Sequence, residues 1–311
     1  MTKIATREAY GKALVRLGEE NENIVVLDAD LAKSTKTIDF AKTYPERFFD
    51  MGIAEQNMLG TAAGLSLGGR IPFASSFAMF ATGRAFEIIR NSIAYPKLNV
   101  KIAATHAGIT VGEDGASHQA IEDIALMRSI PNMTVLVPAD GIETEQAVRA
   151  AAYYQGPVYI RLGRSGVPVI YDDQYTFAIG KANVLKEGAD VTILATGIMV
   201  SLALEAAEAL QKEGVAAEVI NVSTIKPLDA ATILQSLQKT KAAVTAEEHS
   251  IIGGLGSAVA ELSAENFPVP LVRVGVKDVF GESGKPAELL EKYGLTAQGI
   301  KEAVAKVLKK A

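Results

Sequence analysis

The sequence predicts an α/β fold of two domains, each a mostly parallel β-sheet flanked by helices. The first observation is that short β-branched runs alternate with longer helical patterns along the chain. The second is that this alternation starts again after a polar stretch near the middle. The chain has 311 residues, a length that suits two domains of ordinary size.

Five runs in the first half are typical of strands of one sheet. They lie at 23–30, 70–77, 99–106, 133–140 and 157–164. Helical patterns separate these runs, so we expect the strands to run parallel, with helices covering the sheet.

A second series of elements follows the polar turn "YDDQYTFAIGKANVLKEGAD". It comprises strands at 191–197, 216–222, 242–248 and 270–276 and a helix at 201–214. We therefore expect a first domain at 1–170, a linker at 171–185 and a second domain at 186–311.

Composition excludes several classes of protein. The formal net charge of −5 gives no basic surface for nucleic acid or an anionic membrane. The chain has no cysteine, so disulfides and thiolate metal sites are excluded. The N-terminus lacks the apolar core of a secretory signal, and no apolar run is long enough to span a bilayer. We expect a cytoplasmic protein.

Polar side chains gather where the strands of the first sheet end. In open parallel sheets, ligands bind beyond the carboxyl ends of the strands, so this edge is the expected site. These side chains are Asp28, Asp30, Ser75, Ser76, Thr105, His106, Arg161 and Arg164.

The segment "HAGITVGEDGASH" (106–118) concentrates titratable groups in a glycine-rich loop. His106, His118, Glu113 and Asp114 in so short a loop indicate a binding or catalytic site. In the alternative interpretation, the two acids cap the helix in "HQAIEDIALM" and the imidazoles bond loop carbonyls. The residues alone favour neither interpretation.

Three arginines, Arg7, Arg161 and Arg164, could bind phosphate or carboxylate through bidentate hydrogen bonds. Surface ion pairing is the commoner role of any single arginine.

The aromatic residues Phe77 and Phe80 are three apart and share a helix face, as a plain core pair also would. Glu55, in "GIAEQNM", is a carboxylate among small and apolar residues. Such a group needs a helix N-terminus, a salt bridge or a functional partner.

Six stretches together resemble the C-terminal half of transketolases across nearly the whole chain, and most closely the split enzymes whose halves are separate polypeptides. They are "ATR" at 5–7, "DADLAKS" at 28–34, "GIAEQNM" at 52–58, "SSFAMF" at 75–80, "HAGITVGEDGASH" at 106–118 and "RLGR" at 161–164. The resemblance implies a pyrimidine-binding domain of thiamine diphosphate enzymes followed by the transketolase C-terminal domain. It also implies transfer of a two-carbon ketol unit from a ketose phosphate to an aldose phosphate, as in the pentose phosphate pathway.

The resemblance implies roles at the cofactor, to which the difficult chemistry belongs. Glu55 matches the glutamate that hydrogen-bonds N1′ of the aminopyrimidine. That bond favours the imino tautomer, which removes the thiazolium C2 proton. Phe80 matches the aromatic that stacks on the aminopyrimidine, Phe77 supports the same pocket, and Asp30 falls on an aspartate near the cofactor.

Other matches concern the substrate. Asp114 and His118 match residues that contact the sugar hydroxyls near the cleaved bond. Charge-assisted hydrogen bonds to the sugar phosphate would position the reacting carbon from a distance. The residues that match this phosphate cluster are Arg7, Ser34, His106 and Arg164. The expected catalytic set is Glu55, His106, Asp114 and His118.

The chain lacks the "GDG" pattern with which thiamine diphosphate enzymes bind diphosphate and magnesium. Its nearest match is "EDG" at 113–115, inside another motif. Diphosphate needs a metal held on oxygen ligands. We therefore expect a separate N-terminal subunit to supply the Mg²⁺ ligands, and a homodimer of this chain to form the core of a heterotetramer.

Three alternatives remain open. Deoxyxylulose phosphate synthase shares the "AG" at 107–108, but it usually has arginine at the position of His106 and carries both halves on one chain. The beta subunit of 2-oxo-acid dehydrogenases shares the "AEQ" context, but its substrates lack phosphate. A non-catalytic binding or regulatory partner would have no use for Glu55, His106, Asp114 and His118 together.

Overall fold

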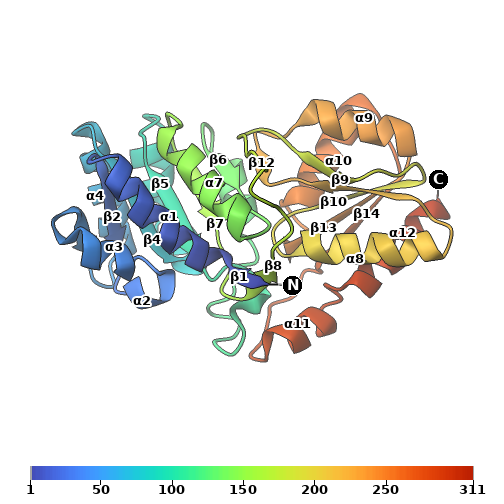
Figure 1. The fold of residues 1–311 in the computed structure, drawn as a ribbon, viewed down its shortest axis with the longest axis horizontal. Coiled ribbons are helices and arrows are strands. Elements are labelled where there is room, and N and C mark those ends of the chain that lie inside the picture. Colours follow the sequence, from blue (N-terminus) through green and yellow to red (C-terminus); the bar gives the residue numbers. More distant parts are fainter. Residues whose placement is uncertain (1, 311) are drawn as a thin grey trace.

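The computed structural model describes residues 2–310, which form two lobes lying side by side (Figure 1). The main sheet has seven strands in the first lobe and five in the second, and a separate two-stranded sheet lies in the first lobe. The predicted α/β class with mostly parallel sheets is confirmed. Within residues 2–310, no helix is long and apolar enough to cross a membrane.

The seven-stranded sheet has the order β12-β6-β7-β5-β4-β2-β3, and only β12 runs antiparallel to its neighbour. Its strands are β2 (Ile24–Asp28), β3 (Phe48–Asp50), β4 (Ile71–Phe77), β5 (Lys101–Thr105), β6 (Thr134–Leu136), β7 (Val158–Arg161) and β12 (Thr224–Lys226). The parallel register pairs Asp28 with Ser75 and Phe77 with Thr105. The carboxyl ends of three central strands therefore meet at one edge.

Helices cover both faces of this sheet. One face packs against α1 (Thr6–Glu20), α3 (Ile38–Thr43) and α7 (Gly141–Tyr153). The other packs against α4 (Glu55–Leu67), α5 (Phe86–Ile88), α6 (Asp123–Ser129) and two π-helical turns, Phe80–Arg84 and Ile89–Ala94. The remaining elements of this lobe are the paired strands β1 (Lys3–Ala5) and β8 (Gly166–Pro168), the helix α2 (Ala32–Thr35) and the 3-10 turns Pro45–Arg47 and Ile109–Val111.

The five-stranded sheet has the order β14-β13-β10-β11-β9, and only β9 is antiparallel. Its strands are β9 (Asn183–Lys186), β10 (Val191–Ala195), β11 (Ala217–Asn221), β13 (Ala243–Ser250) and β14 (Leu271–Val276). One face carries α8 (Met199–Lys212) and α12 (Ala297–Leu308), and the other α9 (Ala230–Thr240) and α10 (Leu255–Asn266). The helix α11 (Pro286–Lys292) lies below the junction of the lobes in Figure 1 and contacts the turn Ile109–Val111.

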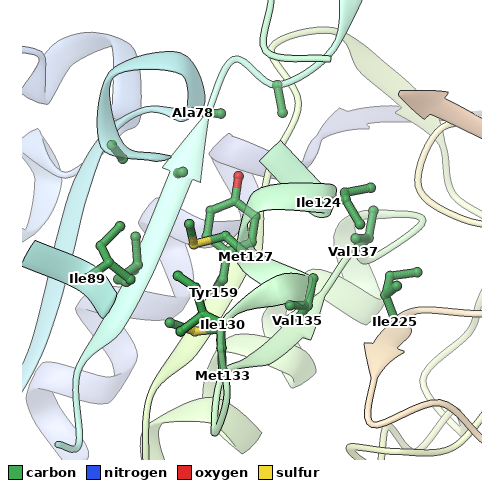
Figure 2. Packing of buried hydrophobic residues seen from close by; sticks show 14 of the residues in the cluster. Ala78, Ile89, Ile124, Met127, Ile130, Met133, Val135, Val137, Tyr159 and Ile225 are labelled. Carbon is green, nitrogen blue, oxygen red and sulfur yellow. The ribbon is translucent and has the colours of Figure 1, made fainter. Parts of the chain in front are cut away.

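The core is continuous between the two lobes. Strand β12 comes from the second half of the chain but pairs with β6 of the first sheet. Figure 2 shows its Ile225 beside Val135 and Val137, in the same buried cluster as Met127 and Tyr159. The two sheets are therefore joined by shared hydrophobic packing as well as by the polypeptide that connects them.

Every strand expected from the sequence is present, as is the helix expected at 201–214. The strands that were not predicted have only three or four residues each. So few residues do not establish an alternating pattern in the sequence. These strands are β1, β3, β8, β9 and β12.

Candidate active site

The segment that follows β2 is fixed by one buried carboxylate. Asp28 accepts hydrogen bonds from the Leu31 N–H (2.7 Å) and from the hydroxyls of Thr35 (2.7 Å) and Thr37 (2.9 Å). Burial raises the pKa of Asp28 to about 6, although these donors act in the opposite direction. The three bonds fold residues 28–37 into a compact turn, which brings the Ser34 carbonyl within hydrogen-bonding distance of Arg7.

Arg7, near the start of α1, reaches this turn and the end of β5. Its Nη1 donates to the Ser34 carbonyl at 2.8 Å and lies 3.5 Å from His106 Nε2. Its Nε is buried and has no hydrogen-bond partner within residues 2–310. Burial lowers the pKa of Arg7, and the charge of Arg164 acts in the same direction. An unpartnered buried donor near a second cation suits an anionic ligand.

His106 follows β5 with φ 57°, in the left-handed region that non-glycine residues rarely occupy. Its ring stacks on Phe77 with 3.8 Å between centroids, and Nδ1 lies 2.9 Å from the Thr105 hydroxyl. Burial, reinforced by the charges of Arg7 and Arg164, lowers the pKa of His106 to about 3. The imidazole is therefore neutral near pH 7, and each ring nitrogen can take a defined hydrogen-bonding role.

An aromatic wall joins β4 to the loop 106–118. Phe77 and Phe80 are stacked at 5.9 Å, with 13° between their planes. His118 meets the edge of both rings, at 6.3 Å from Phe77 and 5.2 Å from Phe80. The sequence-predicted pair is thus no plain core contact, because it faces the loop that carries both histidines.

Glu55 is the first residue of α4, and 2% of its surface is exposed. The positively polarised N-terminus of a helix favours a carboxylate at this position. Arg84 Nη1 bonds both carboxylate oxygens, at 3.2 and 3.1 Å, and its guanidinium lies 5.2 Å from the centre of the Phe80 ring. The Arg84 side chain itself is half exposed. Glu55 is therefore a member of an ion pair at the aromatic wall.

Arg84 was not singled out from the sequence. The only feature of the sequence that could have indicated Arg84 is its position four residues after Phe80, one helical turn away. A cation at this spacing from an aromatic residue is common on any helix. It lies in the π-helical turn Phe80–Arg84, and such irregular turns are frequent at functional sites.

Arg164 holds the loop 106–118 rather than projecting freely. Its guanidinium donates to the Val111 carbonyl and to Glu113 at 3.3 Å, and lies 3.8 Å from Asp114. The helix α6 begins only at Asp123, so the two loop acids do not cap it. The capping interpretation of Glu113 and Asp114 is wrong.

Two further candidates, Asp30 and Arg161, have fewer contacts with the other site residues. Asp30 is exposed at the same edge, with φ 61°, and its N–H bonds the Asp50 carboxylate at 3.1 Å. Arg161 lies behind the site. It is buried against Asp123, at 2.8 and 3.1 Å, and this pairing raises its pKa. Arg161 is therefore not available to bind an anionic ligand.

Comparison with protein families shows to which family this chain belongs. Residues 2–169 match the family described as transketolase, pyrimidine binding domain, and residues 180–300 match transketolase, C-terminal domain. The chain belongs to the transketolase family. This family depends on thiamine diphosphate, and Glu55, Phe77 and Phe80 lie in its pyrimidine-binding domain.

Two relatives of similar length are described as a C-terminal section and as a subunit. The chain is 55% identical to a putative transketolase C-terminal section of Methanocaldococcus jannaschii, over 98% of this chain and 96% of that protein. It is 48% identical to a 6-deoxy-6-sulfo-D-fructose transketolase subunit, SqwH, of a Clostridium species, over 97% of this chain and 94% of that one. With human transketolase it shares 41% identity over 99% of this chain, but only 50% of the human protein. This chain is thus a transketolase subunit corresponding to the C-terminal half.

A solved structure agrees with this assignment. It is a split-gene transketolase described as an inactive beta4 tetramer, 63% identical, with a TM-score of 0.92 and 99% of each chain covered.

The site fits one part of thiamine diphosphate. A buried carboxylate suits a protonatable ring nitrogen, and the Phe80 face suits stacking on an aromatic ring. Within residues 2–310, no group of three or more His, Asp or Glu side chains could hold a metal ion.

Proposed function

We propose that this subunit supplies the pyrimidine half of the thiamine diphosphate site and the residues that bind the sugar, in a two-subunit transketolase. When bound, the cofactor supplies the carbon nucleophile that takes a two-carbon ketol unit from a ketose phosphate. The single observation that supports the proposal most is that the buried Glu55 and the ring of Phe80 share Arg84 as a neighbour, at one end of the aromatic wall whose other end stacks on His106.

Glu55 has the role of holding a proton at N1′ of the aminopyrimidine. Its carboxylate lies at a helix N-terminus and contacts Arg84, whose side chain is half exposed. The guanidinium shares the face of Phe80 on which we propose that the cofactor ring stacks. Arg84 therefore has to move aside when the ring binds, and its exposure leaves it room to do so.

The sugar is held from its two ends. Asp114 is exposed and His118 part-exposed on the loop, and we assign both to hydroxyls near the cleaved bond. The anion at the other end would be bound by Arg7, with its free Nε, by neutral His106 and by Arg164. Ser34, whose carbonyl accepts a hydrogen bond from Arg7, is proposed to belong to the same anion-binding cluster. Asp30 is proposed only to line the cofactor side of this edge.

The rest of the cofactor site is assigned to a partner. We place the Mg²⁺ and diphosphate ligands on a separate N-terminal subunit, because a relative of the same length is described as a transketolase C-terminal section. A pair of these chains would form the core of a heterotetramer. The proposed domain limits are 1–170 and 186–311, with a linker at 171–185. A cytoplasmic location and a place in the pentose phosphate pathway stay predictions.

A sulfonated sugar is a second candidate substrate. It is suggested by the relative that acts on 6-deoxy-6-sulfo-D-fructose. Guanidinium groups bind sulfonate and phosphate through the same donors, so the cluster of Arg7 and Arg164 accepts either anion in principle. A comparison of kcat/KM for xylulose 5-phosphate and the sulfo-sugar, with ribose 5-phosphate as acceptor, separates the two.

The proposal is tested by reconstitution with an N-terminal subunit, Mg²⁺ and thiamine diphosphate. We expect ketol transfer from the wild type and a loss of about 100-fold or more for Glu55→Gln, since an amide cannot share the N1′ proton. Glu87→Gln, a carboxylate on α5 outside the site, is the matched control and should keep full activity. An active, cofactor-loaded Glu55→Gln enzyme would refute the assignment.

A further inference from the structure

One residue of the second lobe bonds directly to the backbone of the loop 106–118. Glu248, in β13, is buried, and its Oε1 accepts a hydrogen bond from the Thr110 N–H at 2.7 Å. Gly108 lies against the same carboxylate, where a Cβ would overlap it, and has φ 82°. The loop and Glu248 therefore fit each other at two adjacent points.

Glu248 is itself rigidly held. Its carbonyl accepts from Arg161 Nη2 at 2.9 Å, and Arg161 is fixed by the ion pair with Asp123. All three side chains are buried. This network crosses from β7 and α6 of the first lobe to β13 of the second, so the anchor cannot shift without breaking charge-assisted hydrogen bonds.

The second lobe also supports the far end of the loop. Gln119 Nε2 donates to the Ile109 carbonyl at 3.1 Å and to the Glu282 carbonyl at 2.9 Å. Gly115 lies against Ser283, close enough that a Cβ would strike its hydroxyl. The loop is thus held between β13 and the segment that precedes α11.

The loop needs such support because its first residue is strained. His106 has a left-handed backbone, which persists only where the surroundings determine it. Three hydrogen bonds follow in succession: Ala107 N–H to the Leu162 carbonyl (3.2 Å), Gly108 N–H to the Ala120 carbonyl (2.8 Å) and Thr110 N–H to Glu248. The first two come from the first lobe, and only the third comes from the second.

We propose that Glu248 is a positioning residue, which fixes the loop carrying His106 and His118 for sugar binding. The second lobe thereby takes part in the reaction without touching the substrate. This inference rests on the proposed function of the loop, but the placement of His106 can be measured separately.

Two variants whose side chains have about the length of glutamate distinguish the effect of the hydrogen bond from the effect of packing. Glu248→Gln keeps an oxygen that accepts from Thr110, whereas Glu248→Met fills the space without an acceptor. Burial raises the pKa of the Glu248 carboxyl, so the folded protein holds its charged form at a cost that Glu248→Met removes, and we expect the Met variant to fold. Glu247→Met is the matched control, because Glu247 is equally buried next door but accepts from Leu255 and Gly256 of α10 (2.7 Å each).

In the reconstituted enzyme, we expect Glu248→Met to raise KM for xylulose 5-phosphate about tenfold, the size of effect that the loss of one hydrogen bond produces. Glu248→Gln should stay near the wild-type KM, as should Glu247→Met. The affinity for thiamine diphosphate should stay unchanged in all three, because Glu55 and Phe80 lie on other elements. An unchanged KM in Glu248→Met, or an equal rise in Glu248→Gln, would overturn the proposal.

Imidazole NMR provides a readout that does not depend on activity. The chain has only three histidines, so each signal can be assigned by single substitution. In the wild type, His106 should not titrate between pH 5 and 8. In Glu248→Met its pKa should rise by about one unit or more, because the loosened loop exposes the ring to water. An unmoved His106 titration contradicts the positioning role, even if the wild-type enzyme proves to have another substrate.

Discussion

The carboxylate of Glu55 is buried at the start of α4 and accepts hydrogen bonds from Arg84, whose side chain is half exposed. From the sequence, Glu55 could be a salt-bridge member or a cofactor ligand. The structure places it in a salt bridge with a half-exposed partner, which is compatible with both roles. The motif identified the buried acid, but a contact between residues 29 positions apart depends on how α4 and the π-helical turn pack.

The Arg84–Glu55 pair should contribute to stability. Arg84→Met would leave Glu55 buried without its counter-charge. The loss expected for a fully buried pair is about 3–5 kcal/mol, which we reduce to about 1 kcal/mol because Arg84 is half exposed and solvent screens it. Urea unfolding of the subunit measures this free energy. In the Glu55→Gln background the same change should have little effect, and an equal loss in both backgrounds would show that the pair is not responsible.

His106 should make the subunit sensitive to acid. Its pKa is lowered to about 3 in the folded state, against an ordinary value near 6.5, so the unfolded chain binds a proton first as the pH falls. This residue therefore destabilises the folded state progressively below pH 6.5, by at most about 1.4 kcal/mol per pH unit. His106→Asn should show a smaller loss of unfolding free energy between pH 7 and pH 5 than the wild type.

The comparison with a variant is needed because buried carboxylates act in the opposite direction. Asp28, with a pKa raised to about 6, favours folding below its unfolded pKa, and this contribution is lost as the pH rises through 6. His118→Asn, on the part-exposed side of the same loop, is the control. If both substitutions change the pH dependence equally, burial of His106 is not the cause.

At the scale of elements, periodicity predicted the long strands, whereas short elements depend on tertiary contacts. Strand β4, with seven residues, is evident from its composition. Strand β12 has three residues and exists because it pairs with β6 in the other lobe. Likewise, the residues alone favoured neither interpretation of the loop acids, and helix capping is excluded only by the start of α6 at Asp123 and by the packing of Arg164 against Glu113 and Asp114.

The whole turn after β2 should depend on the Asp28 carboxylate, which accepts all three of the hydrogen bonds described above. Asp28→Ala removes the acceptor of three hydrogen bonds, each of which contributes about 1 kcal/mol. We expect a loss of about 1–2 kcal/mol in the free energy of unfolding, because relief of the desolvated carboxylate, which burial holds at a raised pKa, offsets part of the lost hydrogen bonding. Asp39→Ala, an exposed carboxylate in α3, should change stability by no more than about 0.5 kcal/mol. Equal effects would mean that the turn does not rely on Asp28.

At the scale of the whole molecule, the sequence predicted two α/β units but not how they meet. The interface is built from residues that no local pattern distinguishes: Ile225 packs on the first sheet, and Arg161 bonds the Glu248 carbonyl. Arg161 was a candidate anion ligand only because it ends a strand at the predicted site. Its burial against Asp123 depends on an element that lies 38 positions away in the chain.

The division of the cofactor site between two chains has a thermodynamic consequence. A ligand that binds only the folded state adds stability by mass action, about 2.7 kcal/mol at 100 times its Kd. For this subunit alone, thiamine diphosphate with Mg²⁺ should leave Tm nearly unchanged, since the pyrimidine pocket of Glu55 and Phe80 offers no ligands for the charged diphosphate. With the N-terminal subunit present, the same addition should raise Tm by several degrees. Differential scanning calorimetry with magnesium pyrophosphate as the control distinguishes the cofactor from its charged end. A full Tm increase for the subunit alone would place the diphosphate ligands on this chain and contradict the divided site.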